Sequence, residues 1–321
     1  MLMVYQLREG RLEVGSLDPE AVWADLTSPS SEESALAESW QKIDLPTPEE
    51  MSDIEPSARL YTDGGAEVMT ATVAIGLTTE TPSKAPVTFV LRDRQLVTIR
   101  HVSIKAFDFF ISRASARAPE PLTDGESVML SLIEGLIDRY ADTMEHTAAE
   151  IDAISAGVFR RSAMGRTQSE ALEILIGDIG RKGDLLGMVR ESLSSFQRLL
   201  AYHAALDSTA RRAPRESRQK VRMLQRDAAA LGELCDSMSA KLSFLLDATL
   251  GLINVQQTQI IKIFSVASVA LLPPTLIASI YGMNFEYMPE LSQPWGYPAA
   301  LGLMVLSAGL PYLYFKKRGW L

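Results

Sequence analysis

The sequence has few of the residues from which reactive or metal-binding sites are usually built. Its one cysteine, Cys235, excludes an intrachain disulfide, and its three histidines, His101, His146 and His203, lie too far apart to match a metal-ligand spacing. Neither a Walker-type glycine loop nor a pair of cysteines occurs. We therefore expect a protein that is not an enzyme and has no cofactor.

Basic side chains are outnumbered as well. The chain has 31 Lys and Arg against 40 Asp and Glu, a net charge of −9, and residues 1–255 hold 27 basic and 38 acidic side chains, a net of −11. A nucleic-acid partner needs a basic surface, so we expect none. An acidic body attracts cations, although acidic surfaces also serve solubility. The first residues lack the basic and apolar regions of a cleavable signal peptide.

Charged side chains are absent from two long runs near the C-terminus, Ile263–Ile280 and Trp295–Phe315. Each run is about long enough to cross the ~30 Å hydrocarbon layer as a helix. Basic residues stand before the first run and after the second, whereas the loop at 282–294 holds only acidic ones. We therefore expect membrane spans at 263–281 and 295–315 with both termini in the cytoplasm. The alternative is a hairpin that only anchors a soluble domain.

The first span carries hydroxyl side chains on one side. At about 100° per residue they fall within an arc of about 100°, together with two apolar residues. The seven members of this stripe are Thr258, Ile261, Ser265, Ser268, Leu272, Thr275 and Ser279. Either the stripe lines a wetted pore, or its hydroxyls bond back to their own helix or to a neighbouring one. Two helices cannot enclose a pore, so the first reading requires several copies of the chain.

Two adjacent prolines, Pro273 and Pro274, interrupt the same span. Proline lacks the amide that bonds the carbonyl four residues back, so the carbonyls of Val269 and Ala270 are expected to lose their helix partners. In lipid such carbonyls are tolerated only beside another helix or water. The pair therefore favours a packed or water-lined assembly over a lone anchor.

The N-terminal part, residues 1–118, is predicted to be an α/β domain. We expect two strands around a Glu9-Gly10 turn, further strands at 58–61, 68–77, 87–91 and 96–99, a helix at 31–43 and a surface loop at 78–86.

Helical patterns follow this domain. Residues 119–216 are predicted to form an antiparallel hairpin of helices at 128–159 and 169–206, with Thr123 and Glu126 as a capping box.

A third helical pattern begins at Ser217 and has no breaker before the membrane. It continues to Tyr281, which is about 65 residues or on the order of 100 Å. The stalk at 217–262 is either a coiled coil or a lever that carries movement of the cytoplasmic domain to the membrane. Residues 316–321 form a basic tail.

Five segments resemble the CorA family of magnesium and cobalt transporters, in particular its enterobacterial branch. They are YGMNF at 281–285, MPEL at 288–291, YFKKRGWL at 314–321, VWADLTSP at 22–29 and EMSDIEPSAR at 50–59. The resemblance covers nearly the whole chain and is dense from about Gly251 onward. It implies an α+β cytoplasmic domain, a long helical stalk and two transmembrane helices, assembled as a funnel-shaped homopentamer.

The resemblance also implies a function. Members carry Mg²⁺, and also Co²⁺ and Ni²⁺, across the bacterial inner membrane. The selectivity filter would be Gly282, Met283 and Asn284. The Asn284 carboxamides of the five subunits would hold the ion through its waters. The stripe would line the pore, with Leu272 and Ile261 as apolar rings.

Acidic residues receive further roles from the resemblance. Glu286 and Glu290 would raise the cation concentration at the outer mouth, or they are simply solvated loop charges. Asp247 would stand at the inner mouth or form a stalk salt bridge with Lys241 or Lys262. Mg²⁺ would also act as a regulatory ligand between subunits, with Asp227 and Glu80 as candidate ligands.

The chain departs from the family pattern at one position, where Thr258 replaces an asparagine. An inner binding ring is therefore in question. Two other functions stay open, a proton-coupled zinc transporter of a related branch and a membrane-tethered scaffold.

Overall fold

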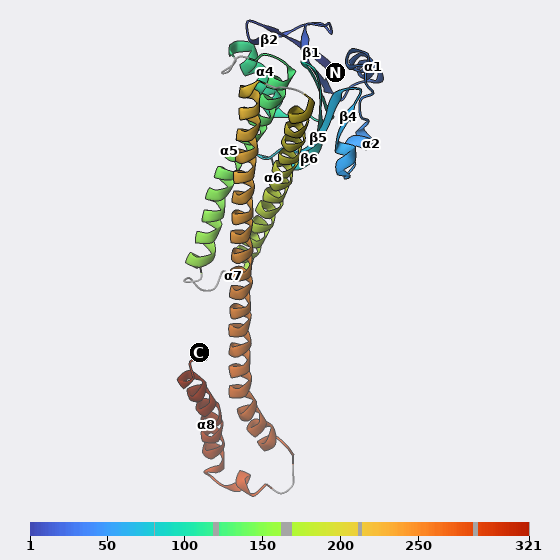
Figure 1. Cartoon of the computed structure of the whole chain (residues 1–321). Helices are drawn as coiled ribbons and strands as arrows, with labels where there is room; N and C mark the ends of the chain where they lie inside the picture. Colours follow the sequence, from blue (N-terminus) through green and yellow to red (C-terminus); the bar gives the residue numbers. More distant parts are fainter. Residues whose placement is uncertain (80, 118–121, 162–168, 211–213, 285–287, 321) are drawn as a thin grey trace. The chain divides into compact units, whose positions relative to one another are not determined.

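The computed structural model of the chain describes residues 1–79, 81–117, 122–161, 169–210, 214–284 and 288–320. It divides into two compact units (Figure 1). The first comprises residues 1–159 and 174–245, and the second comprises residues 160–173 and 246–321.

The first unit is built on a seven-stranded sheet with the order β2-β1-β3-β7-β6-β5-β4. Neighbouring strands are antiparallel except for β3 and β7, which run parallel. The strands are β1 Leu2–Arg8, β2 Arg11–Val14, β3 Ala21–Thr27, β4 Leu60–Asp63, β5 Ala66–Ile75, β6 Ser83–Arg92 and β7 Gln95–Arg100.

Several predicted strands are confirmed. Glu9 and Gly10 both have positive φ, 52° and 74°, as a two-residue hairpin turn between β1 and β2 requires. Strands β5, β6 and β7 lie where alternating apolar residues predicted them. Three boundaries were wrong. Residues 58–59 belong to a short helix, residues 83–86 belong to β6, and β5 ends at Ile75 instead of residue 77, because the chain turns at Gly76 with a φ of 65°.

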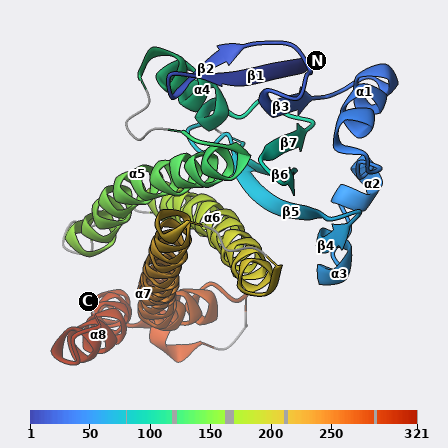
Figure 2. The same cartoon turned by 45° about the horizontal axis from the view of Figure 1, so that its top comes forward.

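Helices cover both faces of this sheet (Figure 2). On one side lie the short helices α1, α2 and α3. On the other lie the long helices α5 and α6, with α4 near β2. Their bounds are α1 Ser31–Gln41, α2 Pro48–Met51, α3 Pro56–Arg59, α4 Lys105–Arg117, α5 Gly125–Arg161 and α6 Ser169–Ala210. The predicted helices at 31–43, 128–159 and 169–206 are thus confirmed, whereas α4 was not predicted.

The two faces of the sheet are held by different contacts. On the α1 side, Ala37 and Met51 pack with Leu26 and Val90 in a buried apolar cluster. On the α5 side, Tyr140 pairs its hydroxyl with the backbone of Ala74, whose N–H donates to it over 2.9 Å. The sheet is therefore buried between two helical layers.

The N-terminus of α5 is capped one residue later than expected. The side chain of Asp124 accepts a hydrogen bond from the Ser127 N–H at 2.9 Å, and the Ser127 hydroxyl accepts one from the Asp124 N–H at 3.1 Å. The predicted box of Thr123 and Glu126 is wrong, and Glu126 instead turns toward His203.

Gly125 should not tolerate a side chain. A Cβ at this position would lie 2.6 Å from the backbone nitrogen of Leu96 and 2.9 Å from the carbonyl oxygen of Arg94, on the β6–β7 turn. We expect Gly125→Ala to destabilise the protein by about 2–3 kcal/mol, because backbone must move to relieve the contact. Thermal melting of the purified protein in detergent measures the effect.

The matched control is Gly135→Ala in the same helix. A Cβ at Gly135 would meet nothing within 4 Å, so alanine there should raise the melting temperature slightly. An unchanged melting temperature in Gly125→Ala would contradict the close approach of α5 to the turn.

Helix α7 spans Arg215–Tyr281, 67 residues without a break, as predicted. In the first unit it pairs with its neighbours through ion pairs: Lys220 lies 2.9 Å from Glu134 of α5, and Arg190 of α6 lies 2.9 Å from Asp236. Lys241 pairs with Asp152 of α5.

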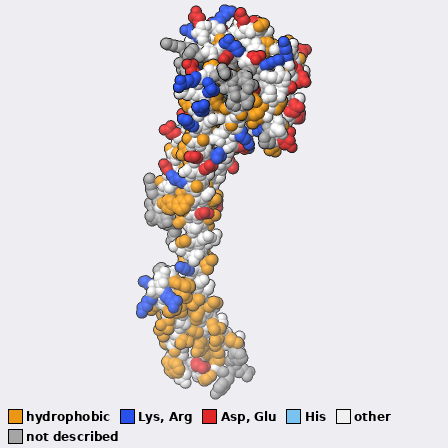
Figure 3. All heavy atoms as spheres, viewed as in Figure 1, with side chains coloured by type: hydrophobic (Ala, Val, Ile, Leu, Met, Phe, Trp, Pro, Cys, Tyr) orange, Lys and Arg blue, Asp and Glu red, His pale blue; other side chains and the backbone are white. Residues whose placement is uncertain are grey.

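The second unit contains the end of α7, a 3-10 turn at Pro289–Ser292 and helix α8 at Gly296–Lys317. Both helices are long and apolar enough to cross a membrane. Pro273 and Pro274 lie inside α7, whose axis bends in its last turns (Figure 1). On the face shown in Figure 3, the surface of this unit is mostly hydrophobic, with basic side chains gathered at one end.

Candidate ion pathway

The stripe is exposed along its whole length. Each of its seven residues has an exposed side chain, and Ile261 and Leu272 are 65% and 66% exposed. By contrast, Val266 is buried, and Lys262, Pro273 and Ile277 are half-buried on a face roughly 120° around the helix. Lys262 lies 5.9 Å from the Trp320 ring just beyond α8, so this second face is turned toward α8. The stripe is therefore free to face other copies or water.

Two stripe hydroxyls are bonded to their own helix. Thr258 and Thr275 donate to the carbonyl oxygens of Asn254 and Leu271, each at 2.8 Å. The back-bonding alternative therefore holds for these two residues, but it does not exclude a polar path. A hydroxyl that has donated its hydrogen still offers two acceptor lone pairs.

Asn254 belongs to the same face and was missed. It lies one turn before Thr258, with an exposed side chain, and it is one of only two asparagines in the chain, the other being Asn284. The same rotation of about 100° per residue would have found it.

The Gly282-Met283-Asn284 motif follows directly after α7, and all three residues are exposed. The N–H of Gly282 donates to the Ala278 carbonyl at 2.9 Å. Gly282 follows the last residue of α7, but it lacks the left-handed conformation of a usual C-terminal glycine. Its φ is not positive; instead, a Cβ there would approach the Ala278 oxygen to 3.1 Å. The position favours glycine because the turn is tight.

The acidic candidates differ in what surrounds them. Glu290 is exposed on the 3-10 turn, and Glu286 lies outside the described residues. Asp247 is exposed and, in the part of the chain that the structure describes, takes part in no ion pair. A salt bridge with Lys241 or Lys262 is wrong as its explanation, because Lys241 pairs with Asp152 and Lys262 lies over Trp320.

Of the two regulatory candidates, the structure describes only Asp227. Glu80 lies outside the described residues, and Asp227 is exposed on α7. Burial and the charges of Glu134 and Asp142 raise the pKa of Asp138 above its ordinary value, and Asp227 adds to this effect. Within the described ranges, no group of three His, Cys, Asp or Glu is placed to hold a metal ion.

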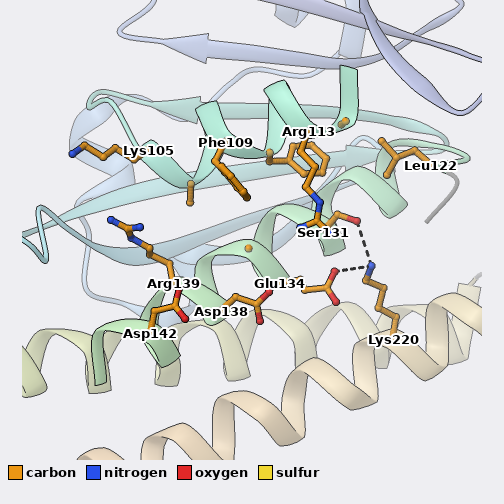
Figure 4. A pocket seen from close by; sticks show the side chains of 14 residues that line it. Lys105, Phe109, Arg113, Leu122, Ser131, Glu134, Asp138, Arg139, Asp142 and Lys220 are labelled. Carbon is orange, nitrogen blue, oxygen red and sulfur yellow. Dashed lines mark hydrogen bonds and ion pairs between the residues drawn. The ribbon is translucent and has the colours of Figure 1, made fainter. Parts of the chain in front are cut away.

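A cavity of about 520 Å³ lies between α4, α5 and the start of α7 (Figure 4). Phe109 and Leu122 lie at its α4 side, and carboxylates of α5 lie at the other. Lys220 reaches across to Glu134 and to Ser131, at 2.9 and 3.3 Å. The lining holds four basic side chains against three acidic ones, so its net charge does not favour a cation.

A buried charge cluster was also missed by sequence reasoning. His203 of α6 places Nδ1 2.6 Å from Glu67 of β5 and Nε2 3.4 Å from Glu126 of α5. Burial alone would lower the pKa of His203, but the hydrogen bonds and charges of Glu126 and Glu67 raise it to about 9. The three residues join the sheet to both long helices.

Comparison with known proteins places the chain in a family. The model of the "CorA-like Mg2+ transporter protein" family matches residues 18–317. The magnesium transport protein CorA of Escherichia coli K12 is 36% identical over 332 residues, covering all of both chains. The structure of the CorA magnesium transporter from Methanocaldococcus jannaschii matches with a TM-score of 0.80 at 18% identity, over 100% of this chain and 99% of that one.

A cytoplasmic domain of ZntB from Vibrio parahaemolyticus also matches, with a TM-score of 0.56 at 12% identity over 78% of this chain and 97% of that one. At this identity it indicates a shared fold and nothing further. The family match and the full-length similarity carry the assignment: the chain belongs to the family of CorA-like Mg²⁺ transporter proteins.

Proposed function

We propose that copies of this chain, as a homopentamer, surround a common axis and carry Mg²⁺ across the membrane, with Co²⁺ and Ni²⁺ as further substrates. The observation that carries this proposal is the exposed stripe of α7, which faces away from α8 and leads to Gly282, Met283 and Asn284. Support also comes from family membership and from full-length similarity to a magnesium transport protein.

The chemistry of the stripe suits a hydrated cation. Mg²⁺ gives up its water reluctantly, and each bound water turns its hydrogens outward. Such an ion needs hydrogen-bond acceptors along its path. Thr258 and Thr275 have already donated their hydrogens to α7 and offer lone pairs, and the Asn284 carboxamide supplies a carbonyl oxygen. Leu272 and Ile261 would form apolar rings that close the path by dewetting.

The outer and inner ends of the path would carry acidic groups. Glu286 and Glu290 would concentrate cations at the outer mouth, and Asp247 would do so at the inner one. Lys316, Lys317 and Arg318 follow the second span, which favours cytoplasmic termini and an external 282–294 loop in a bacterial inner membrane.

The proposed roles of the segments follow the boundaries predicted from the sequence. Residues 1–118 and the hairpin at 119–216 form the cytoplasmic body, and the stalk at 217–262 connects it to the spans at 263–281 and 295–315. Cytoplasmic Mg²⁺ bound between subunits would reduce repulsion among acidic bodies and close the pore. Asp227 and Glu80 are the candidate ligands.

The deciding experiment measures ion flux into liposomes that contain the purified protein. We expect Mg²⁺ influx that does not depend on a pH gradient and that falls as Mg²⁺ inside the liposomes is raised. Uptake of Zn²⁺ that requires a proton gradient, with no Mg²⁺ influx, would favour the zinc transporter. A folded protein that carries neither ion would favour the scaffold, and a monomer in the membrane would contradict the pore.

A further inference from the structure

The chain turns back on itself at the end of α8. Gly319 has a φ of +71°, and its N–H donates to the Lys316 carbonyl at 3.2 Å. The N–H of Trp320 donates to the Phe315 carbonyl at 3.1 Å, and the two rings lie 5.1 Å apart. These two bonds and the ring contact make a complete Schellman motif. The turn therefore fixes the direction in which Trp320 leaves the helix.

Trp320 is directed to the base of the first span. Its ring lies 5.9 Å from the Lys262 ammonium, and Lys262 is half-buried. Lys262 is the only basic residue between Asp247 and Tyr281. A second cation nearby is held in the same way, since the Arg318 guanidinium lies 5.3 Å from the Tyr314 ring. Aromatic rings at this end of α8 thus make cation–π contacts with two basic side chains.

The position of Lys262 makes its restraint important. It lies about 40° around α7 from Thr258, at the very edge of the stripe. A lysine side chain is long and has four rotatable bonds, so a free Lys262 would reach the stripe. In an assembly of several copies around an axis, these ammonium groups would form a ring, and the ring would repel a passing cation.

We propose that Trp320 is a positioning residue that holds the Lys262 ammonium on the α8 side of α7, away from the ion path. This inference rests on the proposed conduction along the stripe. The indole face attracts the ammonium, and the Schellman turn supplies the rigid support that keeps the ring in place.

The test compares four variants in the liposome Mg²⁺ assay. Trp320→Ala should lower the initial rate of influx by roughly 3- to 10-fold, because the freed ammonium opposes the cation. Trp320→Phe keeps an aromatic face and should retain most of the rate. Trp320→Ala combined with Lys262→Gln should return to the rate of Lys262→Gln alone. An equal loss in both backgrounds would mean that Trp320 only anchors the helix, and the proposal would fail.

A second readout does not depend on transport. An amine-reactive reagent applied to the protein in detergent should label Lys262 several-fold faster in Trp320→Ala than in the parent or in Trp320→Phe, as read by peptide mass spectrometry. Equal labelling in all three would overturn the inference. If the parent protein carried no Mg²⁺ at all, the proposed function would fail while faster labelling of Lys262 would still support the contact with Trp320.

Discussion

Replacing Asn284 by alanine should reduce Mg²⁺ influx to the level of protein-free liposomes. In a pentamer the change removes five carboxamides from one ring. At roughly 0.5–1 kcal/mol for each hydrogen bond to the hydrated ion, the loss adds to a few kcal/mol, or about 100-fold or more in rate. Influx measured with a fluorescent Mg²⁺ indicator in proteoliposomes gives the result directly.

Gln293→Ala is the matched control, because it removes a carboxamide from the same loop between α7 and α8. Gln293 is exposed and lies outside the motif, so its loss should leave influx within about twofold, as is usual for surface substitutions. The assembled protein should elute unchanged from a sizing column in both variants. Full influx in Asn284→Ala, at equal protein content, would remove the filter from the proposed pathway.

Replacing His203 by glutamine should produce the largest loss of stability. His203 lies between Glu67 and Glu126, and its pKa is raised to about 9 from an ordinary value near 6.5. A raised pKa means that the charged form stabilises the fold. This contribution is complete below about pH 6.5, is lost as the pH rises through 9, and amounts to about 3 kcal/mol. We expect the melting temperature to fall by several degrees at pH 6.

His146→Gln provides the comparison, since His146 is exposed on α5. Subtracting its melting temperature at each pH removes the effect of other groups that titrate. The gap between the two variants should narrow between pH 8 and pH 10. A gap that is constant with pH would show that His203 contributes by packing and not by charge.

Periodicity predicted the long helices well, because the apolar residues that each helix buries recur every three or four positions along one continuous segment. α5, α6 and α7 all lie where 3/4 spacing placed them. Helix α4, which was not predicted, carries the same 3/4 spacing in Phe107, Phe110 and Ala114.

The sheet was harder to predict, because its strands depend on distant partners. β3 contains a charged residue, Asp25, whose side chain is buried and lies 2.7 Å from that of Arg100 in β7. Pro86 belongs to the predicted loop at 78–86, but in the structure it pairs with Thr72 of β5. It can do so because β7 pairs with β6 only from Val87 onward, so no neighbour on that side needs the amide hydrogen that proline lacks. Neither partner is visible within the local sequence.

The ion pathway divides in the same way. Helical rotation was enough to align the stripe and would have included Asn254, because the face of a single helix is a local property. The position of Lys262 against Trp320 and the cluster around His203 join residues that are 58 to 136 apart in the chain. Such contacts follow from tertiary packing and leave no periodic trace.

The single parallel pair of the sheet bears on how the chain is made. β3 ends at Thr27, but its neighbour β7 begins only at Gln95, so hairpins alone cannot complete the sheet. During synthesis the first three strands emerge with one long edge open until about seventy more residues have left the ribosome. The edge of β3 therefore stays unpaired during this interval, and this is when a chaperone would be needed most.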